Sequence, residues 1–249
     1  GLEIPESAHR IEQFPECVEL ERSINMVQSM GLENPFFHVH QGVVENKTTI
    51  GGQELINYTS FSYVGMAGDP RVIKAAKDAL DKYGASASAS RLVSGERDLH
   101  IELDAAVAGF LGTEAAVTFC SGHATNVSVI GHLFGPDDLV LYDAFAHNSI
   151  VQGATLSGAR RRPFAHNDFQ AVDGLLRRFR RDYRRVLIAI EGVYSMDGDI
   201  PNLPEFIDVK NRHKAILMVD EAHSIGTLGS SGRGVGEQFD VDRAEVELW

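Results

Sequence analysis

The chain has 249 residues and a formal net charge of −12, from 23 Lys and Arg against 35 Asp and Glu. An acidic chain lacks the positive field that sequence-independent binding to nucleic acid or to an anionic membrane surface needs. Hydrophobic residues make up 43% and charged residues 23%, which is the usage of a globular protein with a core. Apolar runs fall short of the roughly 20 residues of a membrane helix and the start is acidic, so we expect a soluble, cytoplasmic protein.

The two cysteines of the chain predict neither a disulfide framework nor a cysteine metal site. Cys120 ends the apolar run AAVTFC, so we expect it to be a small buried side chain rather than a reactive thiol. Cys17 lies in the N-terminal segment.

Residues 1–53 are predicted to form an N-terminal arm, in which the stretch VVENKTTIGGQEL favours a small hairpin. A helix follows over about 70–83. Asp69 can cap this helix, Pro70 suits its first turn, and Gly84 can end it.

Residues 54–249 are predicted to form one α/β domain, because apolar runs alternate with amphipathic stretches and no linker interrupts them. Runs such as RVLIAI are apolar on both faces, which is typical of a parallel sheet covered by helices on each side. The predicted strands are 115–120, 138–142, 160–164, 186–190 and 215–220. The predicted helices are 97–111, 123–133, 148–157, 168–180 and 203–213.

Polar residues that follow the strands are the candidates for a site, since ligands bind at the carboxyl ends of parallel strands. Ser121, Gly122 and His123 follow the first strand and open a helix, where free backbone N–H groups favour a phosphate. The same pattern is common in ordinary strand-to-helix turns. His147 follows the second strand, where a histidine can also act as a plain helix cap.

Two further loops carry acids at the same edge. Glu191 and Ser195 belong to an acidic loop after the fourth strand, whose carboxylates and glycines suit either a hard cation or an ordinary turn. Asp220 and His223 follow the fifth strand and could hold a cofactor ring or a metal ion. The usual dinucleotide, P-loop and hydrolase motifs are missing. A phosphorylated aromatic cofactor would use all of these features: the helix start for its phosphate, a histidine to stack on its ring and an acid to pair with its ring nitrogen. Pyridoxal phosphate fits them best.

The chain resembles the α-oxoamine synthases through five motifs in family order: SRLVSG at 90–95, LHIELDAAVAGFLGTEAAVTFCSGHATN at 99–126, HNDF at 166–169, EGVYSMDGD at 191–199 and VDEAHSIGTLGSSGRG at 219–234. These fold-type I pyridoxal-phosphate enzymes include aminooxononanoate synthase, aminolevulinate synthase, glycine C-acetyltransferase and serine palmitoyltransferase. The resemblance covers about residues 54–240. It implies the large domain of the fold, and the family's small C-terminal domain is expected to be absent from this chain.

The resemblance also implies roles for the candidate residues. Gly122 and His123 would meet the cofactor and, with Ser121, hold its phosphate, while His147 would stack on the pyridine ring. Asp220 would pair with the ring nitrogen, which makes the ring an electron sink. His223 and Ser195 would lie near the phenolic oxygen, and Glu191 would support the site. No metal is implied.

The implied reaction joins a small amino acid to an acyl thioester, with loss of carbon dioxide, to give an α-amino ketone. The family's Schiff-base lysine lies on the strand after the DExH strand, and the sequence stops at Trp249 without it. Lys210 and Lys214 both precede that strand. We therefore expect a truncated, inactive piece of a synthase. The alternatives are a lysine-less partner subunit, or a fold-type I aminotransferase or lyase.

The resemblance implies a homodimer and leaves the amino acid and the acyl donor open. The Ser/Ala run at 84–90 is similar to members embedded in polyketide synthases, whose acyl donor rides on a carrier protein rather than on coenzyme A. The basic stretch at 177–185 could dock such an acidic carrier. The favoured interpretation is the solvated end of a helix, where cations suit the negative end of the dipole.

Overall fold

The computed structural model describes residues 3–32, 34 and 36–249. Residues 1, 2, 33 and 35 of the predicted arm lie outside the described residues. The chain divides into two compact units, residues 1–73 and residues 74–249. The candidate site residues all belong to the second unit.

The first unit contains the predicted hairpin. Its sheet has the order β1-β2-β3 and all its pairs are antiparallel. Gly51 and Gly52 have φ values of 58° and 81°, the left-handed backbone that a tight hairpin turn requires. The sequence did not predict α1, none of whose residues is buried. The elements are η1 (Glu6–Ala8), η2 (Ile11–Gln13), α1 (Pro15–Ser29), β1 (His40–Gln41), β2 (Lys47–Ile50) and β3 (Gln53–Ile56).

The helix predicted after Asp69 is α2 (Pro70–Tyr83). Asp69 accepts a hydrogen bond from the backbone N–H of Arg71 at 2.8 Å, as a residue at a helix start does. Gly84 has φ +78° and its N–H donates to the carbonyl of Leu80 at 2.9 Å, which ends the helix.

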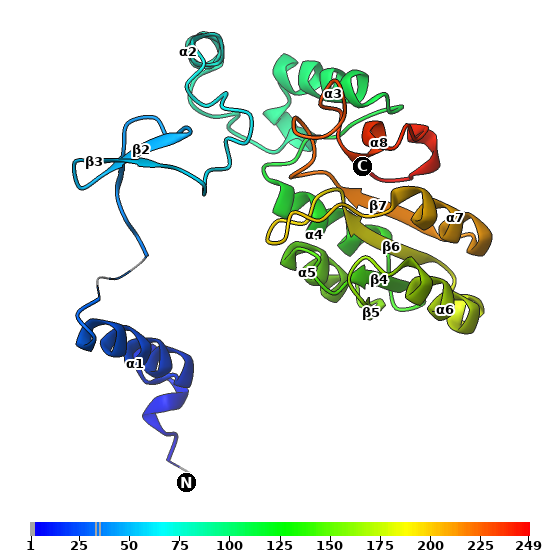
Figure 1. Ribbon diagram of the computed structural model, residues 1–249, viewed down its shortest axis with the longest axis horizontal. Coiled ribbons are helices and arrows are strands. Elements are labelled where there is room, and N and C mark those ends of the chain that lie inside the picture. Colours follow the sequence, from blue (N-terminus) through cyan, green and yellow to red (C-terminus); the bar gives the residue numbers. More distant parts are fainter. Residues whose placement is uncertain (1–2, 33, 35) are drawn as a thin grey trace. The chain divides into compact units, whose positions relative to one another are not determined.

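The second unit is built on a four-stranded parallel sheet of order β5-β4-β6-β7 (Figure 1). This is the predicted α/β class, and four of the five predicted strands are present. Its elements are η3 (Arg91–Gly95), α3 (Asp98–Leu111), α4 (Gly122–Leu133), β4 (Leu139–Asp143), α5 (Asn148–Leu156), β5 (Arg160–Phe164), α6 (Phe169–Phe179), η4 (Arg180–Asp182), β6 (Val186–Glu191), α7 (Leu203–His213), β7 (Ile216–Asp220), α8 (Val235–Gln238) and η5 (Arg243–Glu245).

Helices cover both faces of this sheet, as predicted. Alternate strand residues point to opposite faces. Leu141 and Ile188 pack with Leu176 of α6 and Phe206 of α7 in one core cluster. On the opposite face, the second cluster joins strand residues such as Val140, Leu187 and Ala189 to α4 and α5, through Ile130 and Ile150. Figure 1 shows α4 and α5 on one side of the strands and α6 and α7 on the other.

The strand predicted over 115–120 is wrong, because this segment has no regular secondary structure. Its backbone is held by a side chain instead of a neighbouring strand: the N–H of Thr118 donates to Oδ1 of Asp104 at 2.8 Å. Val117 is 69% exposed, and Cys120 is exposed rather than buried as predicted. An apolar run alone does not distinguish a strand from an extended loop.

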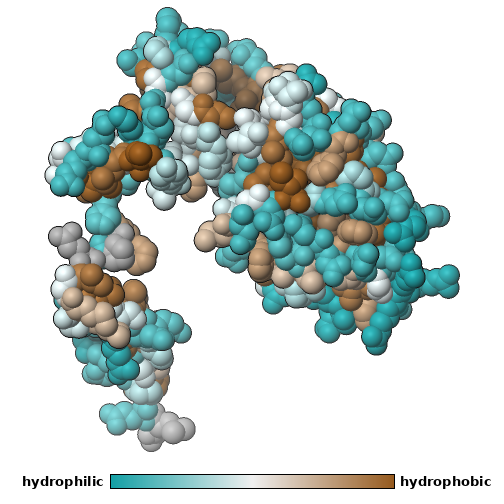
Figure 2. Space-filling model, in the orientation of Figure 1, coloured by the Kyte–Doolittle hydropathy of each residue, from teal (hydrophilic) through white to brown (hydrophobic). Residues whose placement is uncertain are grey.

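The surface of the second unit carries hydrophobic side chains on α3. Five large hydrophobic side chains of this helix are exposed: Leu99, Ile101, Leu103, Val107 and Phe110. The space-filling view shows brown hydrophobic patches among teal hydrophilic residues (Figure 2). Within the described part of the chain, no helix combines the length and the apolar character that crossing a membrane requires.

Candidate functional site

Three carboxylates end three neighbouring strands of the parallel sheet. Asp143 ends β4, Glu191 ends β6 and Asp220 ends β7. Glu191 and Asp220 are direct partners in the strand register, and β4 lies beside β6. The two acids that the sequence placed at one edge therefore do lie together, and Asp143 joins them.

The carboxylate of Asp220 is held in place by α4. Its Oδ2 accepts a hydrogen bond from Nδ2 of Asn126 at 2.7 Å, and its Oδ1 accepts from the N–H of Ala222 at 3.0 Å. Nδ2 of Asn126 also donates to Oγ of Ser149 at 2.9 Å. Both amide hydrogens are thus engaged, so the orientation of the Asn126 amide and of the Asp220 carboxylate is fixed.

His147 begins α5 and joins this network. Nδ1 of His147 lies 2.6 Å from Oγ of Ser149. Ser149 accepts from Asn126, and Asn126 also donates to Asp220, so His147 is linked to Asp220 through these two residues. The backbone N–H of His147 donates to Oε1 of Glu191 at 2.5 Å. The imidazole itself is exposed, and its centroid is 6.1 Å from that of His123 with the rings at 85°. Glu191 and Ser149 therefore fix the position of an exposed ring.

Glu191 is 2% exposed and has a shifted pKa. Burial is the main cause, because a carboxylate is poorly solvated there, and the charges of Asp220 and Asp143 add to the shift. The hydrogen bond from the His147 backbone opposes it, and the balance raises the pKa of Glu191 to about 7. Glu191 is thus a carboxyl group that changes charge near neutral pH.

The start of α4 leaves two backbone donors at the same edge. Oγ of Ser121 accepts from the N–H of Ala124 at 3.1 Å, so this side chain caps the helix. The N–H groups of Gly122 and His123 have no acceptor among the described residues, and a Cβ on Gly122 would meet no atom within 4 Å. An anion could approach these two donors, as the sequence predicts.

Ser195 and His223 lie in the loops that follow β6 and β7. The two loops begin side by side, because the N–H of Gly192 donates to the carbonyl of Asp220 at 2.8 Å. Ser195 is exposed and His223 is half-buried. Their contacts with a cofactor remain predictions.

Glu221 holds the turn that carries His223. Its carboxylate accepts from the hydroxyl of Ser224, from the N–H of Val235 at 3.0 Å and from Nη1 of Arg243 at 3.2 Å. The side chains of Glu221 and Arg243 are 3% and 10% exposed. Gly234 lies against this carboxylate with φ +87°, so only glycine suits the position.

Three residues of the site were missed by the sequence interpretation: Asn126, Ser149 and Asp143. Asn126 lies four residues after Gly122 in α4, so it shares the face of the helix that points to the site. That spacing was the available signal for Asn126. Asp143 directly follows the predicted strand 138–142, which is the signal that selected Glu191, and it was overlooked. Nothing in the sequence marks Ser149.

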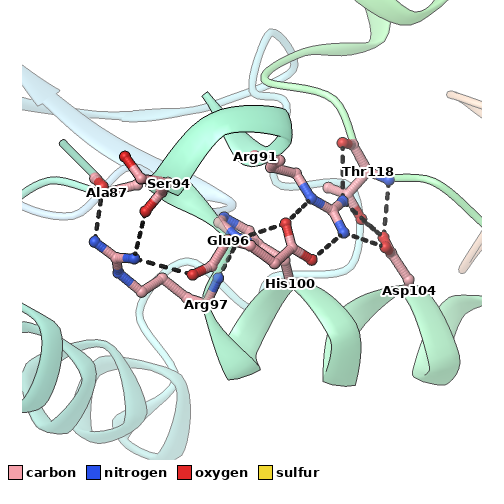
Figure 3. A network of polar contacts seen from close by, with 8 residues as sticks. All are labelled: Ala87, Arg91, Ser94, Glu96, Arg97, His100, Asp104 and Thr118. Carbon is pink, nitrogen blue, oxygen red and sulfur yellow. Dashed lines mark hydrogen bonds and ion pairs between the residues drawn. The ribbon is translucent and has the colours of Figure 1, made fainter. Parts of the chain in front are cut away.

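The SRLVSG motif forms a turn that one arginine holds in place (Figure 3). Arg91 donates to Glu96 at 2.6 and 2.7 Å and to Oδ2 of Asp104 at 2.7 Å. Asp104 also accepts from the hydroxyl of Thr118 at 2.5 Å. The hydrogen bonds from Arg91 and Thr118 lower the pKa of Asp104 to about 2. The motif thus joins α3 to the segment that leads into α4.

The basic stretch at 177–185 is largely engaged within the chain. Arg180 donates to the carbonyls of His213 and Lys214 at 2.9 Å each, at the end of α7. Arg184 and Arg185 pair with Asp138, whose side chain is fully buried. These contacts agree with the interpretation of the stretch as a helix end and do not require a docked partner.

Comparison with known proteins places this chain in a family. The sequence model described as aminotransferase class I and II matches residues 53–247. The chain is 45% identical over 197 residues to the 8-amino-7-oxononanoate synthase of Geobacter sulfurreducens, a match that covers 79% of this chain and 50% of that protein. It is 43% identical over 201 residues to the corresponding synthase of Pelobacter propionicus, covering 81% and 51%. The chain spans about half the length of the curated relatives it matches.

Solved structures agree with these matches. A serine palmitoyltransferase of Sphingomonas wittichii superposes with a TM-score of 0.89 at 35% identity, covering 94% of this chain and 59% of that one. The enzyme of S. paucimobilis with a bound PLP–myriocin aldimine superposes with a TM-score of 0.87 at 34% identity, covering 92% and 58%. These similar proteins are all α-oxoamine synthases.

Proposed function

This chain belongs to the aminotransferase class I and II family, and within it we propose that the chain is the cofactor-binding part of an α-oxoamine synthase. The observation that carries the proposal is the network from Asp220 through Asn126 and Ser149 to His147. It orients a carboxylate and an imidazole at one edge of a parallel sheet, where such sheets bind their ligands. The curated relatives and structural neighbours, all α-oxoamine synthases, support the same activity.

The residues present fit pyridoxal phosphate, which the family and the PLP-bound neighbour also support. A phosphate needs N–H donors, and those of Gly122 and His123 are available at the start of α4. A protonated pyridine nitrogen needs a fixed carboxylate, and Asp220 is one. An aromatic ring needs a flat neighbour, and the exposed imidazole of His147 is linked to this carboxylate through Ser149 and Asn126.

Bound pyridoxal phosphate supplies an electron sink for a carbanion at the α-carbon of an amino acid. Asp220 would keep the ring nitrogen protonated, and Asn126 would keep Asp220 oriented. His147 would cover the ring and meet the amino acid, while Glu191 holds its backbone. Ser195 and His223 would contact the phenolic side of the ring. The roles of Asp220, His147, Ser195 and His223 are the ones that the resemblance implies. Those of Asn126 and of the Glu191 contact are inferred from their hydrogen bonds.

We propose a small amino acid and an acyl thioester, carried on coenzyme A or on a carrier protein, as the substrates. The products would be an α-amino ketone, carbon dioxide and a free thiol. The lysine that binds the cofactor covalently is proposed to lie outside residues 1–249, on the strand that follows β7 in the family. We also propose a homodimer, which the family resemblance implies, and a cytoplasmic location, which the biosynthetic relatives support.

The direct test uses the natural polypeptide that contains these residues, loaded with pyridoxal phosphate. Glycine, alanine and serine are each supplied with acyl-coenzyme A donors of increasing length, and free thiol and carbon dioxide are measured. The proposal expects both products in equal amounts with at least one pair. Transfer of the amino group without thiol release would make the protein an aminotransferase. If neither free thiol nor carbon dioxide is produced and the natural polypeptide has no lysine after β7, the result would favour a silent partner subunit.

A further inference from the structure

His166 begins the HNDF motif and has no role in the proposed reaction. It lies in the connection between β5 and α6, and it is half-buried. Nδ1 of His166 is 2.8 Å from Oδ1 of Asp143, and Nε2 is 3.0 Å from Oδ2 of Asp199. One imidazole therefore joins the end of β4 to the loop that follows β6.

This geometry suits a charged ring. A neutral imidazole has one N–H, whereas two carboxylate oxygens need two donors. Nδ2 of Asn167 lies 3.4 Å from Nε2, but the amide can be turned by 180°, so it imposes no protonation state. The side chain of Asp143 is fully buried, and among the described residues His166 is the cationic group that pairs with it. A buried carboxylate needs both hydrogen bonds and a charged partner, and Asp143 accepts from the N–H groups of Phe145 and Asn167 in addition to facing the ring.

The surrounding charges agree with this assignment. Asp143 and Asp199 contact the ring, the charge of Glu191 interacts with it, and the ring of Tyr194 meets it edge-on at 4.5 Å. Burial would lower the pKa of His166, but the hydrogen bonds to the two carboxylates outweigh burial and raise it.

The two carboxylates lead to two different parts of the site. Asp143 also accepts from the N–H of Phe145 at 2.8 Å, in the turn before His147, and the Phe145 ring stacks on His166 at 4.4 Å. Asp199 closes the loop formed by residues 192–199, which we call the Ser195 loop. Its carbonyl accepts from the N–H of Tyr194 at 3.0 Å.

We propose that His166 is a positioning residue, whose doubly paired imidazolium fastens the Ser195 loop to the turn before His147. Loss of the proton leaves one N–H. The ring then keeps its bond to the buried Asp143 and releases Asp199, so the Ser195 loop opens as the pH rises. This inference rests on the proposed function in one respect: the proposed function identifies the site that the Ser195 loop belongs to.

The test follows the protein alone, without cofactor or substrate, so its failure is distinct from a failure of the proposed function. NMR gives the pKa of His166 from its ring protons. Hydrogen exchange of the Tyr194 and Gly198 amides, corrected for the intrinsic rate, is followed from pH 5.5 to 9. We expect exchange to rise about tenfold through the pKa of His166, the change that loss of one charge-assisted hydrogen bond produces.

Two aspartates of the same loop provide the comparison. Asp199→Asn removes the charge that faces Nε2 and is expected to lower the pKa of His166 by about one unit. Asp197→Asn is the control, because Asp197 is exposed and makes no side-chain hydrogen bond to the described residues. In His166→Asn, exchange in the Ser195 loop should be fast and independent of pH.

The proposal is overturned if exchange in the wild-type loop shows no step at the pKa of His166, or if Asp199→Asn leaves that pKa where it was. Equal shifts in Asp197→Asn and Asp199→Asn would also overturn it, since the effect would then be general electrostatics. The exchange step at the pKa of His166 is measured in the folded wild-type protein. The proposal therefore remains testable even if His166→Asn does not fold.

Discussion

Nδ2 of Asn126 lies 2.7 Å from Oδ2 of Asp220, although 94 residues separate the two in the chain. The contact links the first turns of α4 to the end of β7. Because Asn126 is buried and also donates to Ser149, it connects the carboxylate that would face a ring nitrogen with the histidine that would cover the ring.

Asn126→Ala is expected to lower the free energy of unfolding by about 1–3 kcal/mol, because it leaves buried groups without their donor. It should also weaken binding of pyridoxal phosphate, since Asp220 is no longer held. Urea denaturation and cofactor titration measure the two effects. Asn148→Ala, at an exposed position of α5, is the matched control. Equal effects of the two substitutions would contradict the role given to Asn126.

The raised pKa of Glu191 makes stability depend on pH. Its folded-state pKa of about 7 exceeds the ordinary value of 4.5, so the folded state binds more protons between these pH values and stability falls as the pH rises through that window. Above pH 7 the penalty is complete, on the order of 3 kcal/mol.

Glu191→Gln removes this charge and keeps an acceptor for the N–H of His147. We expect the variant to lose the slope between pH 4.5 and 7 and to be more stable than the wild type at pH 8. Urea denaturation at pH 5, 6, 7 and 8 measures the difference. Glu114→Gln, at an exposed position, should retain the slope of the wild type. A parallel pair of curves for wild type and Glu191→Gln would show that Glu191 is not the titrating group.

The ion pair of Glu221 and Arg243 is nearly buried, so removal of one partner strands a charge. Arg243→Met is expected to cost about 3–5 kcal/mol of unfolding free energy. The double variant with Glu221→Gln should cost less than the sum of the single variants, because no charge is then stranded. Additive costs, measured by urea denaturation of all four proteins, would show that the pair does not interact.

Asp104 is predicted to hold the segment before α4 through Thr118. Asp104→Asn should speed hydrogen exchange of the Thr118 amide, because the acceptor for its N–H loses its charge and its contact with Arg91. The pKa of Asp104 is about 2. The wild-type hydrogen bond between Asp104 and the Thr118 N–H is therefore complete above pH 4, and it weakens only as the pH falls toward 2. Glu102→Gln on the same helix is the control and should leave the Thr118 amide unchanged.

The sequence predicted much of the α/β unit because its signals are local and repeated. Strands apolar on both faces and amphipathic helices between them specify a covered parallel sheet, and polar residues after the strands fall at one edge by topology. That reasoning located Glu191 and Asp220 as neighbours. It did not find Asn126, although Asn126 lies four residues after Gly122 on the same face of α4; its partner Asp220 is distant in the chain.

Two errors have separate causes. The run AAVTFC is apolar enough for a strand, but Asp104 satisfies the N–H of Thr118 and the segment remains an extended loop with Cys120 exposed. Helix α1 was not predicted, although Leu20, Ile24 and Val27 recur at the spacing of one helix face, because the segment was interpreted only as an arm with a hairpin.

The central claim is that these residues form the pyridoxal-phosphate site of an α-oxoamine synthase. The most direct measurement is borohydride reduction of the cofactor-loaded natural polypeptide, followed by mass mapping of the modified peptide. The account predicts that the cofactor is fixed to one lysine that follows β7 in the sequence and lies beyond Trp249, and that binding weakens in Asp220→Asn. Binding that is absent, or that is fixed to Lys210 or Lys214, would contradict it.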